Sequence, residues 1–386
     1  MASLQHPLRR MVARRGQAMR AVAATASRAP PQNVAATIMM RSRSVSTAAP
    51  ATPDKQRAAF DRDGFLVVEN FATAAECDAM RAQMAKLVAE WDGLSRTVFR
   101  TDGEQEAAQG SSDYFLDSAD RCHFFLEPDA VDPDTGGIRA GLPRLEAMNK
   151  AGHGLHSADP VFREYAQSGK VAALTRALGW AAPVLPQSMY IFKQPRIGGA
   201  VTSHQDSCFL YTTPRQTCLG LWLALHDATL NNGCVWARPG SHTEPVRRFF
   251  ARNPEHFGPA LDGAGGDPSA PQMVFEPGSD EARAEGEAAK EGGGAAPWEG
   301  ALPELPEPGA KGAAAAGFVP CEVKAGDLVV IHGAVDHLSL PNTSEEPRHT
   351  FQLHLVEGPG AGVTWHPRNW LQLPGGKPFP ALGGVE

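Results

Sequence analysis

The chemistry that this sequence could perform is indicated first by the segment His204-Gln205-Asp206. Side chains two residues apart in a β-strand project from the same face, so this spacing places an imidazole beside a carboxylate. Both groups bind metal ions. The segment follows a Gly-Gly turn and is predicted to begin a strand. Alone the pattern is weak, because a hydrogen-bonded surface pair would have the same sequence.

The apolar run at 326–331 is followed by Gly333 and then by His337, which is the predicted third ligand. Two histidines and one carboxylate on one face form the facial triad of non-haem Fe(II) oxygenases, which leaves positions open for other ligands. Arg348 lies eleven residues beyond His337. Its planar guanidinium matches a carboxylate and could anchor the far end of 2-oxoglutarate. His332 ends the same apolar run and is the main rival for the third position.

Other histidines and acids are given ordinary roles. His226, His242 and His354 are expected to be structural or to lie outside the ligand shell. Asp227 follows an apparent strand end and has no motif around it. The metal ligands are therefore sought in the H-x-D segment and in the region beyond residue 326.

The elements that must position these groups are mostly short strands. Apolar runs separated by Gly, Pro and Asn turns predict them at 189–192, 208–211, 219–225, 234–237, 328–331 and 351–356. A capping box at Thr73 and Glu76 predicts a helix over 74–92, and a second helix is predicted over 160–178. The expected fold is mainly β with supporting helices, and its core is a double-stranded β-helix, the cupin-like jelly roll.

The chain divides into two parts by composition. Residues 1–53 contain eight arginines and no Asp or Glu, which predicts a mitochondrial transit peptide. A plastid transit peptide and a disordered basic tail on a cytoplasmic protein are the alternatives. Residues 54–386 are expected to form a single domain. Within it, the Gly-, Ala-, Pro- and Glu-rich stretch at about 258–317 predicts a disordered insertion or a long surface loop.

Bulk properties exclude several classes of partner. The net charge is -7, and the leader contributes eight positive charges, so the rest of the chain is acidic and a nucleic-acid partner is not expected. No apolar run is long enough to predict a membrane span. Six cysteines occur without a C-x-x-C pair, which argues against a zinc ribbon or a disulfide scaffold. A small-molecule partner is expected, and the oligomeric state stays open.

Several segments resemble the phytanoyl-CoA dioxygenase family. They are Pro186–Pro195, Thr202–Asp206, Leu219–Leu223, Asn232–Trp236 and Pro239–His242, with further likeness at Asp63–Val68 and Trp365–Trp370. The resemblance covers about residues 55–257 and 318–383, and leaves out the leader and the insertion.

The resemblance implies specific roles. It implies Fe(II) ligation by His204, Asp206 and His337, binding of a 2-oxoglutarate carboxylate by Arg348, and further cosubstrate contacts from Lys150, Met189 and Trp222. The family-like spacing to Arg348 favours His337 over His332. The implied enzyme is a 2-oxoglutarate-dependent dioxygenase. It would use O2 to convert 2-oxoglutarate to succinate and CO2, and would hydroxylate a small-molecule or acyl substrate.

Three alternatives are weighed against this function. Related halogenases lack the carboxylate ligand so that chloride can bind the iron, and Asp206 therefore favours hydroxylation. A jelly-roll protein could instead use zinc or manganese for hydrolysis or isomerisation. A low-turnover sensor could bind 2-oxoglutarate without much catalysis. The primary substrate is not specified by fold or cosubstrate motifs.

Overall fold

The structure is a computed structural model that describes residues 52–93, 97–98, 112–278 and 305–383. These residues belong to one unit, Pro50–Glu386. The predicted transit peptide lies outside the described residues except at its last two positions. Within the described part of the chain, no helix is both long enough and apolar enough to cross a membrane.

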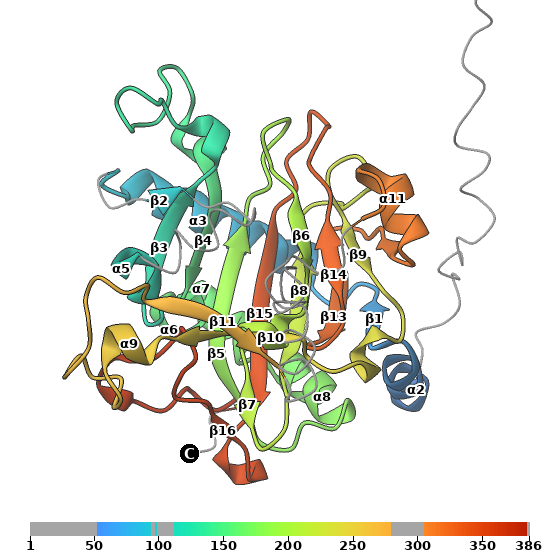
Figure 1. The fold of residues 1–386 in the computed structure, drawn as a ribbon. Helices are drawn as coiled ribbons and strands as arrows, with labels where there is room; N and C mark the ends of the chain where they lie inside the picture. Colours follow the sequence, from blue (N-terminus) through green and yellow to red (C-terminus); the bar gives the residue numbers. More distant parts are fainter. Residues whose placement is uncertain (1–51, 94–96, 99–111, 279–304, 384–386) are drawn as a thin grey trace, which may run out of the picture. The chain divides into compact units, whose positions relative to one another are not determined.

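Two mainly antiparallel sheets face each other and hold the core (Figure 1). The larger has the order β1-β13-β8-β15-β5-β4-β3-β2, and the smaller has the order β12-β9-β14-β6. The strands of the larger sheet are β1 (Phe65–Val68), β2 (Thr97–Val98), β3 (Cys122–Leu126), β4 (Met148–His153), β5 (Pro183–Ile191), β8 (Leu219–Ala224), β13 (Leu328–His332) and β15 (Thr350–Glu357). Those of the smaller are β6 (Val201–His204), β9 (Val235–Ala237), β12 (Val319–Cys321) and β14 (His337–Ser339).

The chain winds between the two sheets in the manner of a jelly roll. From β5 onward it passes to β6, returns to β8, crosses to β9 and β12, returns to β13, crosses to β14 and ends in β15. Two small two-stranded sheets complete the strands. One pairs β10 (Arg248–Arg252) with β11 (Met273–Pro277), and the other pairs β7 (Thr212–Thr213) with β16 (Thr364–Trp365). The predicted double-stranded β-helix is confirmed.

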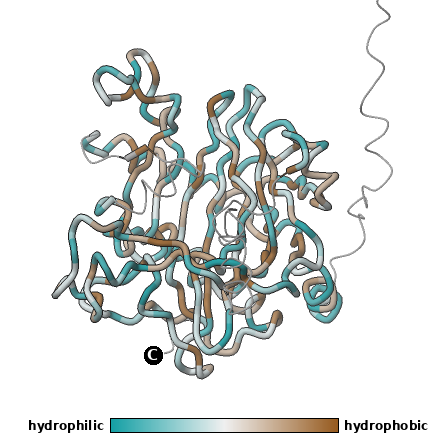
Figure 2. The backbone as a smooth tube through the Cα atoms, viewed as in Figure 1, coloured by the Kyte–Doolittle hydropathy of each residue, from teal (hydrophilic) through white to brown (hydrophobic). Residues whose placement is uncertain are grey.

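Helices pack around the two sheets, and some of them cover the outer face of the larger sheet (Figure 1). The helices are α2 (Pro53–Asp63), α3 (Ala74–Glu90), α5 (Asp113–Leu116), α6 (Leu155–Ala158), α7 (Pro160–Ala166), α8 (Gly169–Ala177), α9 (Pro254–Phe257) and α11 (Gly309–Ala315). The buried face of α3 and residues of α7 and α8 pack in one apolar cluster with alternate residues of β8 and β15. Figure 2 shows hydrophobic stretches running through these central strands.

Alternation along each central strand separates two environments. In β8, Leu219, Leu221 and Leu223 belong to the helix-side cluster, whereas Trp222 belongs to the cluster between the sheets. Successive side chains in a strand point to opposite faces, so every second residue of β8 faces the smaller sheet. The space between the sheets is therefore lined by the residues that alternate with the apolar core, and polar groups among them need hydrogen-bond or ionic partners.

Two predicted elements are wrong in detail. The strand expected at 208–211 is absent, and a short 3₁₀ turn at Asp206–Cys208 stands at its start. Phe209 and Leu210 donate backbone hydrogen bonds to Asp206 O, so the backbone is satisfied locally rather than by a neighbouring strand. The helix expected over 160–178 is two helices, α7 and α8, because the chain turns at Gln167 and begins again after Ser168.

The insertion predicted at 258–317 is also wrong in part. Met273–Pro277 forms β11, and Gly309–Ala315 forms α11. β11 pairs along its whole length with β10, and Ala313 packs in the cluster between the sheets. Low-complexity composition hid both elements, because their burial depends on partners far away in the sequence. Residues 279–304 lie outside the described part of the chain.

The capping box predicted at the start of α3 is present and gives a stability test. Thr73 Oγ1 accepts from Glu76 N at 3.2 Å, and Thr73 N donates to Glu76 Oε2 at 2.7 Å. Thr73→Ala should lower the free energy of unfolding by about 1 kcal/mol, because an N–H at the helix start loses its partner. Urea unfolding measures this. Thr73→Ser keeps the oxygen and should stay close to wild type, so an equal loss in both variants would contradict the capping account.

Candidate metal centre and its cavity

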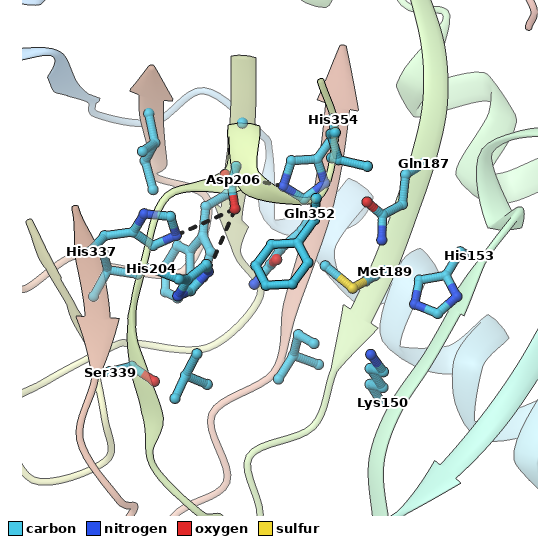
Figure 3. A pocket seen from close by; sticks show the side chains of 18 of the residues that line it. Lys150, His153, Gln187, Met189, His204, Asp206, His337, Ser339, Gln352 and His354 are labelled. Atoms are coloured by element: carbon cyan, nitrogen blue, oxygen red, sulfur yellow. Dashed lines mark ion pairs between the residues drawn. The ribbon is translucent and has the colours of Figure 1, made fainter. Parts of the chain in front are cut away.

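Three potential metal ligands meet at one end of the space between the sheets (Figure 3). His204 ends β6, His337 begins β14, and the two residues are directly opposite in the antiparallel pairing of these strands. Asp206 follows in the 3₁₀ turn, where its Oδ1 lies 3.5 Å from His204 Nε2 and 3.6 Å from His337 Nε2. One ligand atom from each residue falls within 4.8 Å of the others. The sequence-predicted triad is therefore brought together.

Backbone carbonyls fix the orientation of both imidazoles. His204 Nδ1 lies 2.9 Å from Thr202 O, and His337 Nδ1 lies 3.0 Å from Val335 O. A carbonyl oxygen only accepts, so each Nδ1 carries the proton and each Nε2 presents its lone pair toward Asp206. Hydrogen-bonded Nδ1 and outward Nε2 is the usual arrangement of a metal-ligating histidine. The donor set fits a divalent transition metal.

The electrostatics of the triad also suit a cation. Burial works to raise the pKa of Asp206, but His337, His354 and His204 together hold that pKa well below its usual range. Burial, reinforced by His204, lowers the pKa of His337 to about 4. At neutral pH an ionised Asp206 thus faces a neutral His337 imidazole, which is the protonation state that metal binding requires of these two groups.

His354 is a neighbour of the triad that was expected to lie outside the ligand shell. Its Nε2 is 3.4 Å from Asp206 Oδ2, the oxygen turned away from His204 and His337. Gly220 lies beside this contact, and a Cβ there would stand 3.1 Å from Asp206 Oδ2. His354 and the small Gly220 therefore hold the carboxylate in one orientation, as outer partners of ligating carboxylates do.

The structure corrects the reasoning about the H-x-D motif while keeping its result. The motif ends β6 instead of beginning a strand, so Asp206 does not reach the metal side by strand alternation. The turn after Gln205 brings the carboxylate back toward His204. The rival His332 points into a separate cavity lined also by Trp180 and His242, where its Nδ1 accepts from Ala334 N at 3.1 Å.

Arg348 lies in the same cavity as the triad and is almost completely buried, with 2% of its surface exposed. Its guanidinium stands 5.1 Å from the Trp222 ring and donates to Thr350 Oγ1 at 3.4 Å. Burial lowers its pKa to about 9, so it stays charged at neutral pH. No carboxylate of the described residues pairs with it. A buried cation of this kind requires an anion.

The other residues carried over from the family resemblance line the same cavity. Met189, Gln352 and Trp222 are register neighbours across β5, β15 and β8, on the face turned toward the smaller sheet. Lys150 enters from β4 and is 3% exposed, and burial lowers its pKa well below the usual range. Lys150, Met189, Trp222 and Arg348 are therefore assembled around one space with the triad.

Sequence reasoning missed several lining residues. Gln187 and Gln352 are polar residues on the inner faces of β5 and β15 and could have been found from strand alternation. Ser339, two residues after His337, could have been found in the same way. An aromatic wall could not, because Phe115, Phe209, Phe250, Phe275 and Trp370 come from five separate segments.

The fold and the cavity together define a jelly-roll protein with a His-Asp-His cluster and a buried arginine facing it. The sequence profile of the phytanoyl-CoA dioxygenase (PhyH) family matches residues 60–350. The chain belongs to this family, and its enzyme class, a 2-oxoglutarate-dependent dioxygenase, is the one predicted from the sequence.

Named relatives are similar over nearly their full length. Phytanoyl-CoA dioxygenase domain-containing protein 1 of Mus musculus is 42% identical over 84% of this chain and 96% of its own length. Phytanoyl-CoA dioxygenase 1 of Oryza sativa is 38% identical over 83% of this chain and 93% of its own. Among solved structures, EctD from S. alaskensis with 2-oxoglutarate and 5-hydroxyectoine matches with 18% identity and a TM-score of 0.49, covering 88% of this chain and 89% of that chain.

The geometry of the two candidate histidines gives a direct prediction. His337→Ala should weaken binding of a probe metal such as Co(II) by at least about a hundredfold, since it removes a ligand rather than one of the outer partners whose loss costs ten- to a hundredfold. His332→Ala is the matched control and should bind Co(II) within about twofold of wild type. Metal titration followed by absorbance measures both. Loss of binding in His332→Ala alone would contradict the assignment.

Proposed function

We propose that this chain is an Fe(II)- and 2-oxoglutarate-dependent hydroxylase of a small-molecule or acyl substrate, with His204, Asp206 and His337 as its metal ligands. The observation that carries the proposal is one cavity that contains both a triad of metal-ligand type and a buried arginine without an anionic partner. A zinc or manganese hydrolase needs the triad but has no use for the second feature.

Bound Fe(II) and 2-oxoglutarate would supply the oxidative chemistry, in which O2 and the keto acid yield succinate, CO2 and a hydroxylated substrate. The chain's own residues bind and orient. Arg348 offers a planar pair of N–H donors to the far carboxylate of the cosubstrate. Trp222 stacks against that guanidinium and limits its movement.

Lys150, Met189 and Gln352, which line the same cavity, would contact the cosubstrate. Lys150 would supply a second cation, because the charge of a bound dianion would offset the burial that lowers the pKa of this lysine. Met189 supplies an adaptable apolar contact. The aromatic wall excludes water from the space beside the triad, on the side where Phe209 and Phe250 lie. Asp206, held by His354, completes the ligand set that favours hydroxylation over halogenation.

The reaction itself is tested by oxygen-dependent succinate formation. Purified protein with Fe(II), 2-oxoglutarate and ascorbate should release succinate, while zinc- or manganese-loaded protein and His204→Ala should not. No succinate with iron, together with tighter binding of zinc or manganese than of iron, would support the hydrolase or isomerase alternative. Tight binding of 2-oxoglutarate with negligible succinate, in the presence of candidate substrates, would support the sensor alternative.

Arg348 gives a second prediction, because a lysine keeps the charge but loses the fork. Arg348→Lys should raise the dissociation constant of 2-oxoglutarate roughly thirty- to a hundredfold, the equivalent of about 2 to 3 kcal/mol for a charge-assisted hydrogen bond. Metal affinity should be unchanged. Calorimetric titration of metal-loaded protein without oxygen measures the first quantity.

The matched control for this substitution is Arg196→Lys. Arg196 is paired with Glu345 at the surface and does not line the cavity. The Arg196→Lys variant should bind 2-oxoglutarate with the same affinity as wild type. Wild-type affinity in Arg348→Lys would remove Arg348 from the cosubstrate site.

A further inference from the structure

Lys193 is a buried lysine beside the cavity that none of the roles above uses. It follows β5, is 3% exposed, and has an unusual positive φ of 34° for a residue with a side chain. Its Nζ donates to Gly199 O at 2.7 Å and to Ser339 Oγ at 2.8 Å. Its carbonyl accepts from Arg348 N at 3.2 Å. Lys193 thus contacts both Ser339 and Arg348, which line the cavity.

The path of the Lys193 side chain is built into the fold. Gly233, which has a φ of +86°, lies alongside it, and a Cβ at that position would overlap the Lys193 Cε atom. Asn342 Nδ2 donates to Lys193 O at 3.0 Å and fixes the backbone from the other side. The ammonium therefore reaches Ser339 along a fixed route.

The hydrogen bond between Lys193 and Ser339 has a defined direction. Lys193 Nζ donates in this contact. An anion in the cavity would hold Lys193 as an ammonium, which has three donors and no lone pair, so Ser339 Oγ must be the acceptor. The one proton of the Ser339 hydroxyl is then left to donate, and no acceptor among the described residues receives it. Ser339 lines the cavity and lies two residues after His337 on β14, as Figure 3 shows. A hydroxyl donor is thus presented to whatever occupies the cavity.

The charges around Lys193 favour an anion in the cavity beside Arg348 and Ser339. Burial lowers the pKa of Lys193 well below the usual range, Arg348 lowers it further, and Glu127 acts in the opposite direction. Burial raises the pKa of Glu127 to about 7, so this carboxylate only partly offsets the two cations at neutral pH. An anion beside Arg348 would stabilise both cations in their charged forms.

We propose that Lys193 is a positioning residue for the cosubstrate: it turns the Ser339 hydroxyl toward the cavity, so that Ser339 and Arg348 together hold the far carboxylate of 2-oxoglutarate. This inference rests on the proposed function, because it takes 2-oxoglutarate as the anion. Lys193 itself touches no reacting atom. Its effect on the cosubstrate passes through Ser339, with a smaller contribution from its charge.

A double-mutant cycle tests the proposal by equilibrium binding. The variants are Lys193→Met, Ser339→Ala and the two together, loaded with Fe(II) without oxygen and titrated with 2-oxoglutarate in a calorimeter. Each single substitution should raise the dissociation constant about three- to tenfold, the usual worth of one hydrogen bond. The dissociation constant of the double variant should be at most about twice that of the single variant that binds more weakly, because both substitutions remove the same interaction.

The control is Lys170→Met, which makes the same substitution at a partly exposed lysine paired with Glu76, away from the cavity. It should leave the dissociation constant within about twofold of wild type. A purely structural Lys193 would lower the melting temperature and leave 2-oxoglutarate affinity unchanged, and that result overturns the proposal. Effects of the two substitutions that multiply in the double variant also overturn it.

Ser339→Ala keeps the test decisive if Lys193→Met does not fold, since unchanged affinity in Ser339→Ala alone refutes the proposed path. The wild-type titration separates this inference from the function on which it rests. Saturable 2-oxoglutarate binding in wild type with no coupling between the two positions defeats only the role of Lys193. No binding in wild type defeats both.

Discussion

The antiparallel pairing of β14 with β6 is the constraint on which the rest of the site depends. It sets His337 directly opposite His204, and opposed residues on adjacent strands are close enough for their side chains to touch. Their rings stand 4.2 Å apart between centroids. A shift of this register by one residue would turn His337 to the other face. The position of Ser339 depends on the same pairing, because it follows on the same face of β14.

Buried charge explains how the cavity is organised around this pair. Asp206 lies at one end with three histidines around it, and Arg348 and Lys193 lie at the other end with Glu127 behind them. Charges buried in this way destabilise a fold unless each finds a partner. Asp206 and Arg348 are in one cavity but do not pair with each other. A cation at the first and an anion at the second would satisfy both, which is what a metal ion and a dicarboxylate supply.

The fold class and the H-x-D part of the triad were predictable because they depend on local patterns, whereas the choice of His337 over His332 came from the family resemblance. The capping box at Thr73 and the apolar run of β13 are local, and so is the H-x-D spacing. The prediction of a strand at Cys208–Tyr211 was wrong, because an apolar run alone does not distinguish a strand from a buried turn. β11 was missed because its partner β10 lies across a loop, and nothing within the segment itself indicates the pairing.

The cavity beyond the triad was only partly predictable for the same reason. Alternation in β15 predicts that Gln352 and His354 share a face, but nothing in the sequence indicates which residues of other strands lie beside them. Nothing in the residues around Lys193 indicates that it is buried, because its burial depends on Gly233 and on a strand almost 150 residues further along the chain. Contacts of that range become visible only once the two sheets are closed against each other.

The central claim is that the triad and Arg348 hold two parts of one ligand set, and a crystal of the protein grown with Mn(II) and 2-oxoglutarate tests it most directly. Anomalous scattering should place one metal ion among His204 Nε2, Asp206 Oδ1 and His337 Nε2. Density for the dicarboxylate should run from that ion to the guanidinium of Arg348. A metal bound elsewhere, or a dicarboxylate that does not reach Arg348, would contradict the account.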